Sequence, residues 1–166
     1  PVLRHNAWDV LSLVALAAHL AGVCEGEGEP LHAARAAEYE GDLAEAVRRF
    51  EAALAQPRLG RPARLQVIEH LARCTKKLGR HDEAARWWGA LVAEPRSRRV
   101  LPYVELAKHA EHRERDRAGA LRYVDEALDL VQKGLARPGS PGSETSLEGL
   151  LLRRERLLGK VGAAAR

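Results

Sequence analysis

The chain has 166 residues and carries 27 lysines and arginines against 23 acidic residues, for a net charge of +4; 46% of its residues are hydrophobic and only 4% aromatic. This length is enough for one domain with its own core, and the abundance of Ala, Leu, Arg and Glu favours helices packed through small side chains. We expect an all-α fold. No apolar run is long enough to span a bilayer, and no Gly-rich phosphate loop, Ser/His/Asp pattern or Cys/His zinc motif occurs, so neither a membrane protein nor a self-sufficient enzyme is expected.

The first predicted helix lies within residues 1–24 and contains an apolar run from Val10 to Val23. His5 and Asp9 precede this run at a spacing of four residues, which places them on one face of a helix. From the residues alone, Asp9 has a simple structural explanation, because a carboxylate in the first turn of a helix interacts favourably with the helix dipole.

A repeat follows in residues 30–136, with units at about 30–57, 63–95 and 100–134. Residues 41–54 align without gaps onto residues 79–92. Each unit is predicted to be a helical hairpin that buries one face against its neighbour. Alanine recurs where two helices must approach closely, and the matching positions are Ala46, Ala84 and Ala120.

Turn residues support the hairpins. Gly41 and Gly79 are predicted to end the first helix of a hairpin in the left-handed conformation that glycine adopts at low cost. Asp42 and Asp82 are then candidates to cap the second helix. Bulky side chains four residues after the repeated alanines are predicted to fill the next groove, and these are Phe50, Trp88 and Val124.

These features resemble the tetratricopeptide repeat (TPR). The resemblance also covers the small residues of the first helices, Ala34, Ala72 and Ala107. Departures are repeats longer than usual in the family, a third turn (111–119) without glycine at the expected place, and no aromatic side chain at Ala37 or Thr75. The resemblance implies a right-handed superhelix of about three hairpins whose first helices line a concave groove. A protein or peptide partner would bind there through Arg35, Tyr39, Arg73, Lys76, Lys77, Lys108 and His112.

Charge is unevenly distributed, with 11 basic and 4 acidic residues between positions 58 and 99. Arg73, Lys76 and Lys77 share one helical face, so a second candidate partner is the backbone of DNA or RNA. The alternative is a solvated helix face. His109 and His112 lie three residues apart, but no third ligand is spaced to complete a metal site, and two exposed helix histidines are expected.

The end of the repeat is marked by a Pro/Gly/Ser-rich segment, 137–145, which is predicted to be a flexible linker. A capping helix is predicted at 146–160, with leucines inward and Arg153, Arg154 and Arg156 outward. Cys24 and Cys74 match no metal spacing, which predicts two buried, reduced cysteines and a cytoplasmic location. No oligomeric state is assigned from the sequence.

The stretch His5-Asn6-x-x-Asp9-Val10-Leu11-Ser12-Leu13 is similar to the last motif of RNase H-fold, DEDD-type 3′ to 5′ exonuclease domains, in particular those of bacterial YprB-type proteins with a following TPR array. The resemblance implies that Asp9 is one of four carboxylates that hold two Mg²⁺ or Mn²⁺ ions in a longer parent protein, with His5 near the nucleophile. The other three carboxylates would lie upstream of Pro1. A single carboxylate does not hold two such ions against their hydration, so no cofactor and no nuclease activity are expected of this chain. The alternative is an independent TPR adaptor in which His5 and Asp9 are ordinary helix residues.

Overall fold

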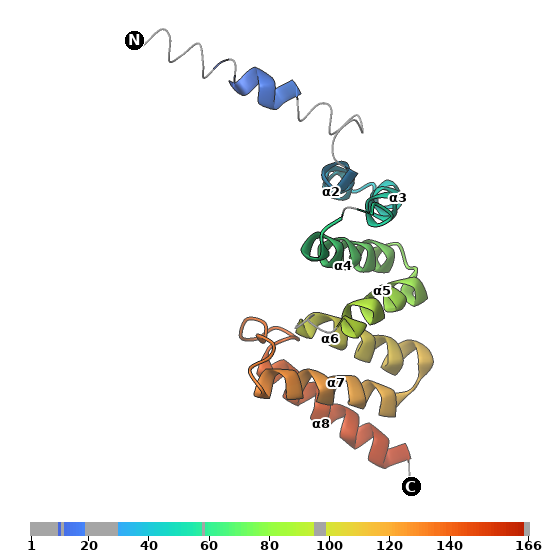
Figure 1. Ribbon diagram of the computed structural model, residues 1–166. Coiled ribbons are helices and arrows are strands. Elements are labelled where there is room, and N and C mark those ends of the chain that lie inside the picture. Colours follow the sequence, from blue (N-terminus) through green and yellow to red (C-terminus); the bar gives the residue numbers. More distant parts are fainter. Residues whose placement is uncertain (1–9, 11, 19–29, 58, 95–98, 165–166) are drawn as a thin grey trace. The chain divides into compact units, whose positions relative to one another are not determined.

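The computed structural model of the chain describes residues 10, 12–18, 30–57, 59–94 and 99–164 (Figure 1). Residues 10 and 12–18 are helical. The later elements are α2 (Pro30–Glu40), α3 (Leu43–Leu54), α4 (Arg61–Lys77), α5 (His81–Ala93), α6 (Val100–His109), the π-helix η1 (Ala110–Glu114), α7 (Arg117–Gln132) and α8 (Leu147–Ala164). No β-strand occurs in these described ranges, which confirms the prediction of an all-α fold. None of the described helices combines the length and hydropathy needed to cross a membrane.

The chain divides into two compact units, residues 1–78 and 79–166. In the first unit, α3 packs against both α2 and α4. The helix α3 begins because the Asp42 carboxylate accepts a hydrogen bond from the Glu45 amide at 3.0 Å, as predicted for a cap. Its buried side chains recur at helical spacing, at Ala46, Val47, Phe50 and Ala53.

In the second unit, consecutive helices from α5 to α8 pack pairwise against one another. The core between α6, α7 and α8 contains Val104, Val124, Leu150 and Leu157, all fully buried. Leu150 and Leu157 are seven residues apart, about two turns, and therefore lie on the same face of α8. They pack this helix against the rest of the unit.

The residues that define the repeat are buried throughout. Alanine at the first-helix positions is fully buried at Ala34, Ala72 and Ala107, and the second-helix positions Ala46, Ala84 and Ala120 are at most 3% exposed. The bulky residues Phe50, Trp88 and Val124 are equally buried, as predicted. The repeat in the sequence therefore corresponds to a repeat of packing positions. Thr75 stands where the TPR pattern often has an aromatic residue. It is buried, and its hydroxyl donates a hydrogen bond to the Leu71 carbonyl at 2.6 Å.

Left-handed residues shape the turns between successive helices. Gly41 (φ +88°) and Gly79 (φ +77°) adopt the left-handed conformation, which confirms the prediction. In the turn without glycine, the chain passes through η1 and Arg115 takes the left-handed conformation instead (φ +58°). Asp116 then caps α7 by accepting a hydrogen bond from the Gly119 amide at 2.7 Å.

The prediction that Asp82 caps α5 is wrong. The residue at the cap position of α5 is Arg80, which makes no capping hydrogen bond through its side chain. Asp82 lies two residues further along, in the first turn of the helix, where its carboxylate interacts with the helix dipole instead. The position of the cap is nevertheless the same in both helices, because the gap-free alignment of residues 41–54 with 79–92 pairs Arg80 with Asp42.

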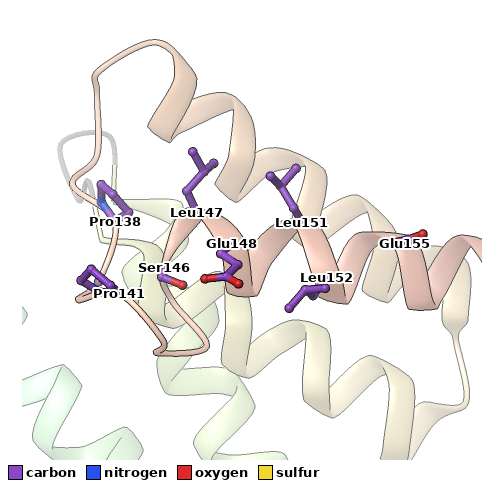
Figure 2. Close-up of a pocket in the computed structure, with 9 residues that line it drawn as sticks. Pro138, Pro141, Ser146, Leu147, Glu148, Leu151, Leu152 and Glu155 are labelled. Atoms are coloured by element: carbon purple, nitrogen blue, oxygen red, sulfur yellow. The ribbon is translucent and has the colours of Figure 1, made fainter.

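The segment 137–145, predicted as a flexible linker, is a hydrogen-bonded loop in this structure. The Gly139 amide donates to the Thr145 carbonyl at 2.9 Å, and Arg137 pairs with Arg99 in an isolated parallel bridge. Figure 2 shows Pro138 and Pro141 beside the start of α8, where Ser146 caps the helix by accepting from the Gly149 amide at 3.0 Å. The loop thus positions the first turn of α8.

Candidate interaction surfaces

The two residues assigned to catalysis by resemblance, His5 and Asp9, lie outside the described residues, as does Cys24. Among the residues that are described, no group of three or more His, Cys, Asp or Glu side chains is arranged to hold a metal ion. These residues therefore do not provide a site for the Mg²⁺ or Mn²⁺ ions that the nuclease resemblance implies, and the surfaces of the helices carry the remaining candidates.

A polar face is formed where α2 and α4 lie side by side in the first unit. An Arg35 guanidinium nitrogen donates to the Gln66 side-chain oxygen at 2.9 Å, and Nδ1 of His70 lies 2.6 Å from a Glu38 carboxylate oxygen. The His70 ring also stacks on Phe50 at 5.0 Å between ring centroids. We call this surface the α2/α4 face; it comprises Arg35, Glu38, Tyr39, Gln66, Glu69, His70, Arg73, Lys76 and Lys77.

Five of the predicted groove residues, Arg35, Tyr39, Arg73, Lys76 and Lys77, belong to the α2/α4 face. Tyr39 is 95% exposed. Arg73 pairs with Glu69 one turn earlier at 2.7 Å. Lys76 and Lys77 are exposed in the last turn of α4, where their charges also favour the helix dipole. With four cations against two carboxylates, the face has a basic excess.

Cys74 lies beneath this face, next to Glu38. Cys74 is fully buried and reduced, as predicted. Burial raises the pKa of its thiol to about 11, and the neighbouring Glu38 carboxylate adds to this effect. Because a thiol must ionise to act as a nucleophile or a metal ligand, Cys74 is a packing residue rather than a reactive one.

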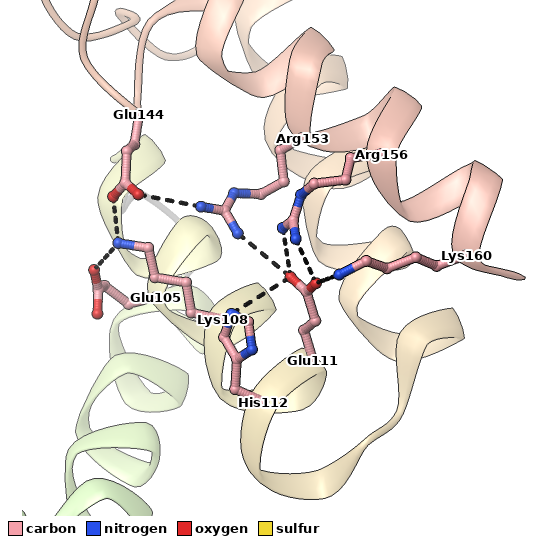
Figure 3. Close-up of polar contacts among 8 residues, drawn as sticks. All are labelled: Glu105, Lys108, Glu111, His112, Glu144, Arg153, Arg156 and Lys160. Atoms are coloured by element: carbon pink, nitrogen blue, oxygen red, sulfur yellow. Dashed lines mark hydrogen bonds and ion pairs between the residues drawn. The ribbon is translucent and has the colours of Figure 1, made fainter.

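The remaining groove candidates, Lys108 and His112, belong to an ion-pair cluster of the second unit (Figure 3). Glu111 is at its centre, with a side chain that is only 4% exposed. Arg156 donates to both of its carboxylate oxygens, at 2.7 and 2.6 Å, and Lys160 donates to one at 2.8 Å. Burial alone would raise the pKa of Glu111, but these hydrogen bonds and charges outweigh it and lower the pKa to about 2.

Lys108 joins the same cluster from α6. It forms ion pairs with Glu105, at 3.1 Å, and with Glu144 in the loop before α8. Burial lowers the pKa of this lysine, yet the hydrogen bonds that it donates to Glu144 and Glu105 more than compensate and raise the pKa above its ordinary value. His112 lies 3.7 Å from Glu111 and is mostly exposed. Lys108 therefore has a structural task, which is to join α6 to the start of α8.

Two expectations from the sequence are corrected in this region. The side chain of Arg153 is 11% exposed and contacts Glu111 and Glu144 instead of pointing outward, because the buried Glu111 carboxylate attracts the cations of α8. His109 is not an exposed histidine, since its side chain is 13% exposed and its Nε2 lies 3.4 Å from Glu114. No nearby group completes a metal site with it among the described residues.

An apolar groove of about 530 Å³, which the sequence interpretation missed, lies between the loop and α8 (Figure 2). It is lined by Pro138, Gly139, Pro141, Ser146, Leu147, Glu148, Leu151, Leu152 and Glu155. The signal was present in the sequence, since α8 contains more leucines than one buried face can use.

The geometry assigns no family by itself, and comparison of the chain with protein-family models, curated proteins and solved structures finds no match.

Proposed function

We propose that this chain is an interaction scaffold of TPR-like helical hairpins, which docks a segment of a protein partner on its α2/α4 face. The observation that carries the proposal is Tyr39, which is 95% exposed beside Arg35. In TPR arrays the first helices of successive hairpins line the binding groove. The side-by-side placement of α2 and α4, through the Arg35–Gln66 contact, is consistent with that arrangement.

The chemistry of the face suits an acidic peptide segment. Tyrosine and arginine are the residues that most often dominate the binding energy of protein interfaces, because they offer large contact areas together with hydrogen-bond donors. Arg73 and His70 pair with Glu69 and Glu38, and the face as a whole carries four cations against two carboxylates, with Lys76 and Lys77 at the end of α4. A partner that places carboxylates there is electrostatically favoured.

Selection of peptides from a random displayed library against the purified chain tests this proposal. We expect acidic sequences to be enriched, and we expect Tyr39→Ala to weaken their binding by about tenfold, equal to about 1.4 kcal/mol. The control is Lys133→Ala, which removes an exposed cation that pairs with Asp129 in the second unit. Peptides without acidic enrichment, or unchanged binding by Tyr39→Ala, contradict the proposal.

The nucleic-acid alternative is tested by the same protein with single-stranded oligonucleotides. Binding through Lys76 and Lys77 must weaken steeply as salt increases, because each phosphate contact releases a counterion. The double variant Lys76→Glu with Lys77→Glu must then abolish it. If an oligonucleotide competes with the selected peptides and shows this salt dependence, the face serves a nucleic acid and the peptide proposal is wrong.

We further propose that the chain belongs to a larger YprB-type protein with an RNase H-like nuclease domain. The proposal rests on the His5 and Asp9 motif and is supported by the helix that follows it. Val10, Leu13, Val14 and Leu16 of that helix are all more than half exposed. An apolar helix of this kind is suited to packing against another domain.

The gene that encodes this chain tests the connection. The proposal predicts that its sequence contains three further carboxylates, in strand-like segments upstream of Pro1. A longer protein that contains them should cleave DNA or RNA with Mg²⁺ or Mn²⁺, and Asp9→Asn should abolish the activity. The present chain should show none. An upstream sequence without those carboxylates favours the alternative of an independent TPR adaptor.

A further inference from the structure

The helix α8 exposes an unusual amount of apolar surface. Four of its leucines are between 43% and 61% exposed, namely Leu147, Leu151, Leu152 and Leu158. Leu150 and Leu157 provide the buried face that packs against α7. Because successive helical residues are 100° apart, Glu148, Leu152 and Glu155 lie on the side of α8 opposite to Leu150, and Leu147 and Leu151 lie between that side and the buried face. Figure 2 shows Leu147 and Leu151 on one edge of that side and Leu152 on the other.

The charges of α8 are separated between its two sides. Its cations are used internally: Arg153, Arg156 and Lys160 contact Glu111, and Arg154 contacts Asp125 at 2.6 Å. Glu148 and Glu155 lie on the groove side, are exposed, and form no hydrogen bond or ion pair within the part of the chain that the structure describes. The exposed side of α8 is therefore apolar with acidic groups, although the helix as a whole has a basic excess.

We propose that this groove is a docking site for an amphipathic helix of a partner protein, with a leucine-like apolar stripe and lysines or arginines beside it. The apolar stripe would cover the exposed leucines, and the basic residues would meet Glu148 and Glu155. Charge complementarity favours this occupant over two others. The carboxylates of Glu148 and Glu155 would repel an acidic helix, and they would lose their hydration without compensation against a purely apolar helix.

The length of the site sets the length of the occupant. From Leu147 to Glu155, the residues of α8 that line the groove, the helix rises by about 12 Å, at about 1.5 Å per residue. A helix of about two to three turns, with apolar residues at i, i+3 or i+4, and i+7, covers this distance. Pro138 and Pro141 close one end of the groove and so define where the partner helix begins or ends.

A pair of designed peptides tests the proposal. Both are fluorescein-labelled, helix-stabilised 14-residue probes with the same leucine stripe, and they differ in carrying either lysine or glutamate beside it. We expect the purified chain to bind the lysine peptide at least about tenfold more tightly than the glutamate peptide in fluorescence polarisation. We expect Glu148→Lys with Glu155→Lys to reverse this preference.

A second set of variants locates the binding. Leu151→Glu with Leu152→Glu should weaken binding of the lysine peptide by about tenfold or more. Leu13→Glu is the control, because Leu13 is 65% exposed, close to the 61% of Leu152, but belongs to the other unit. Since all three leucines are half exposed or nearly so, circular dichroism spectra should not change.

Three results would overturn the inference: equal binding of both peptides, unchanged binding by the Leu151 and Leu152 variant, or a wild-type dimer that this variant dissociates. The last result would mean that a second copy of the chain covers the groove. Sedimentation velocity of the wild type and of the variant measures the oligomeric state. None of these experiments involves Tyr39 or the α2/α4 face. The failure of this site and the failure of the proposed peptide-binding function are therefore distinguishable.

Discussion

Replacing Glu111 with glutamine tests whether the ion-pair cluster of Figure 3 stabilises the second unit. The substitution keeps the shape of the side chain but removes the charge that Arg156 and Lys160 share. In the folded chain the pKa of Glu111 is about 2, against 4.5 for an unperturbed carboxyl. The folded pKa is therefore depressed, and ionised Glu111 contributes stability that is fully present above the unfolded pKa and is lost as the pH falls toward about 2.

The magnitude follows from the separation of the two pKa values. At about 1.4 kcal/mol for each pH unit between them, the contribution of Glu111 to the free energy of unfolding at pH 7 is about 3 kcal/mol. By the same linkage, roughly 2 kcal/mol remains at pH 3.5, because the unfolded carboxyl is then mostly protonated while the folded one is still ionised. Glu111→Gln should remove these amounts.

Urea unfolding followed by tryptophan fluorescence measures the effect. Trp87 and Trp88 both belong to the second unit, so a Trp8→Phe background restricts the signal to that unit. A loss of about 3 kcal/mol should lower the urea midpoint by about 1 M or more. Glu148→Gln is the matched control, since its carboxylate is exposed on α8 and forms no ion pair among the described residues. Equal midpoints for the two variants at pH 7, or a difference that does not shrink by pH 3.5, would refute the reasoning.

Three further predictions concern the packing. Phe50→Ala should destabilise the first unit by about 3 to 5 kcal/mol in thermal or urea unfolding, because the ring is fully buried against His70; a loss below about 1 kcal/mol would contradict that packing. Arg115→Gly should stabilise the second unit by about 1 kcal/mol, because only the wild-type residue bears the cost of a left-handed φ of +58°; an unchanged midpoint would show that the turn is not strained. Cys74 should react with a thiol reagent at pH 8 only as fast as the unit opens, because burial holds the thiol pKa near 11; immediate labelling of the native chain would exclude its burial.

The repeat and its packing positions were predictable because they depend on local periodicity. Small residues such as Ala46 recur at each equivalent position, and the left-handed glycines Gly41 and Gly79 recur in two of the turns, so their spacing alone identifies them. The misplaced cap at Asp82 shows the limit of this reasoning. An aspartate two residues from the true start of a helix looks like a cap in the sequence, and only the backbone angles decide which residue begins the helix.

The orientation of α8 was not predictable in the same way. Helical spacing separates its side chains into faces, but it does not say which face turns inward. Leu150 and Leu157 differ from Leu151 and Leu158 by a single position, and either pair is consistent with an apolar stripe. The choice is made by Glu111, which lies more than forty residues earlier and draws the α8 cations toward it. No local pattern contains that information.

The separation of charge on α8 also determines how the two proposed surfaces differ. The α2/α4 face has a basic excess and favours an acidic segment, whereas the outer side of α8 presents Glu148 and Glu155 and favours a basic helix. A partner suited to one surface is repelled by the other, so the two sites need not compete even if both ligands are present. Reversal of the charges at Glu148 and Glu155 should therefore allow the acidic ligand of the α2/α4 face to bind α8 as well, which appears as a second binding event in calorimetry. A stoichiometry that stays at one after this reversal would mean that the leucines, and not the carboxylates, determine what α8 accepts.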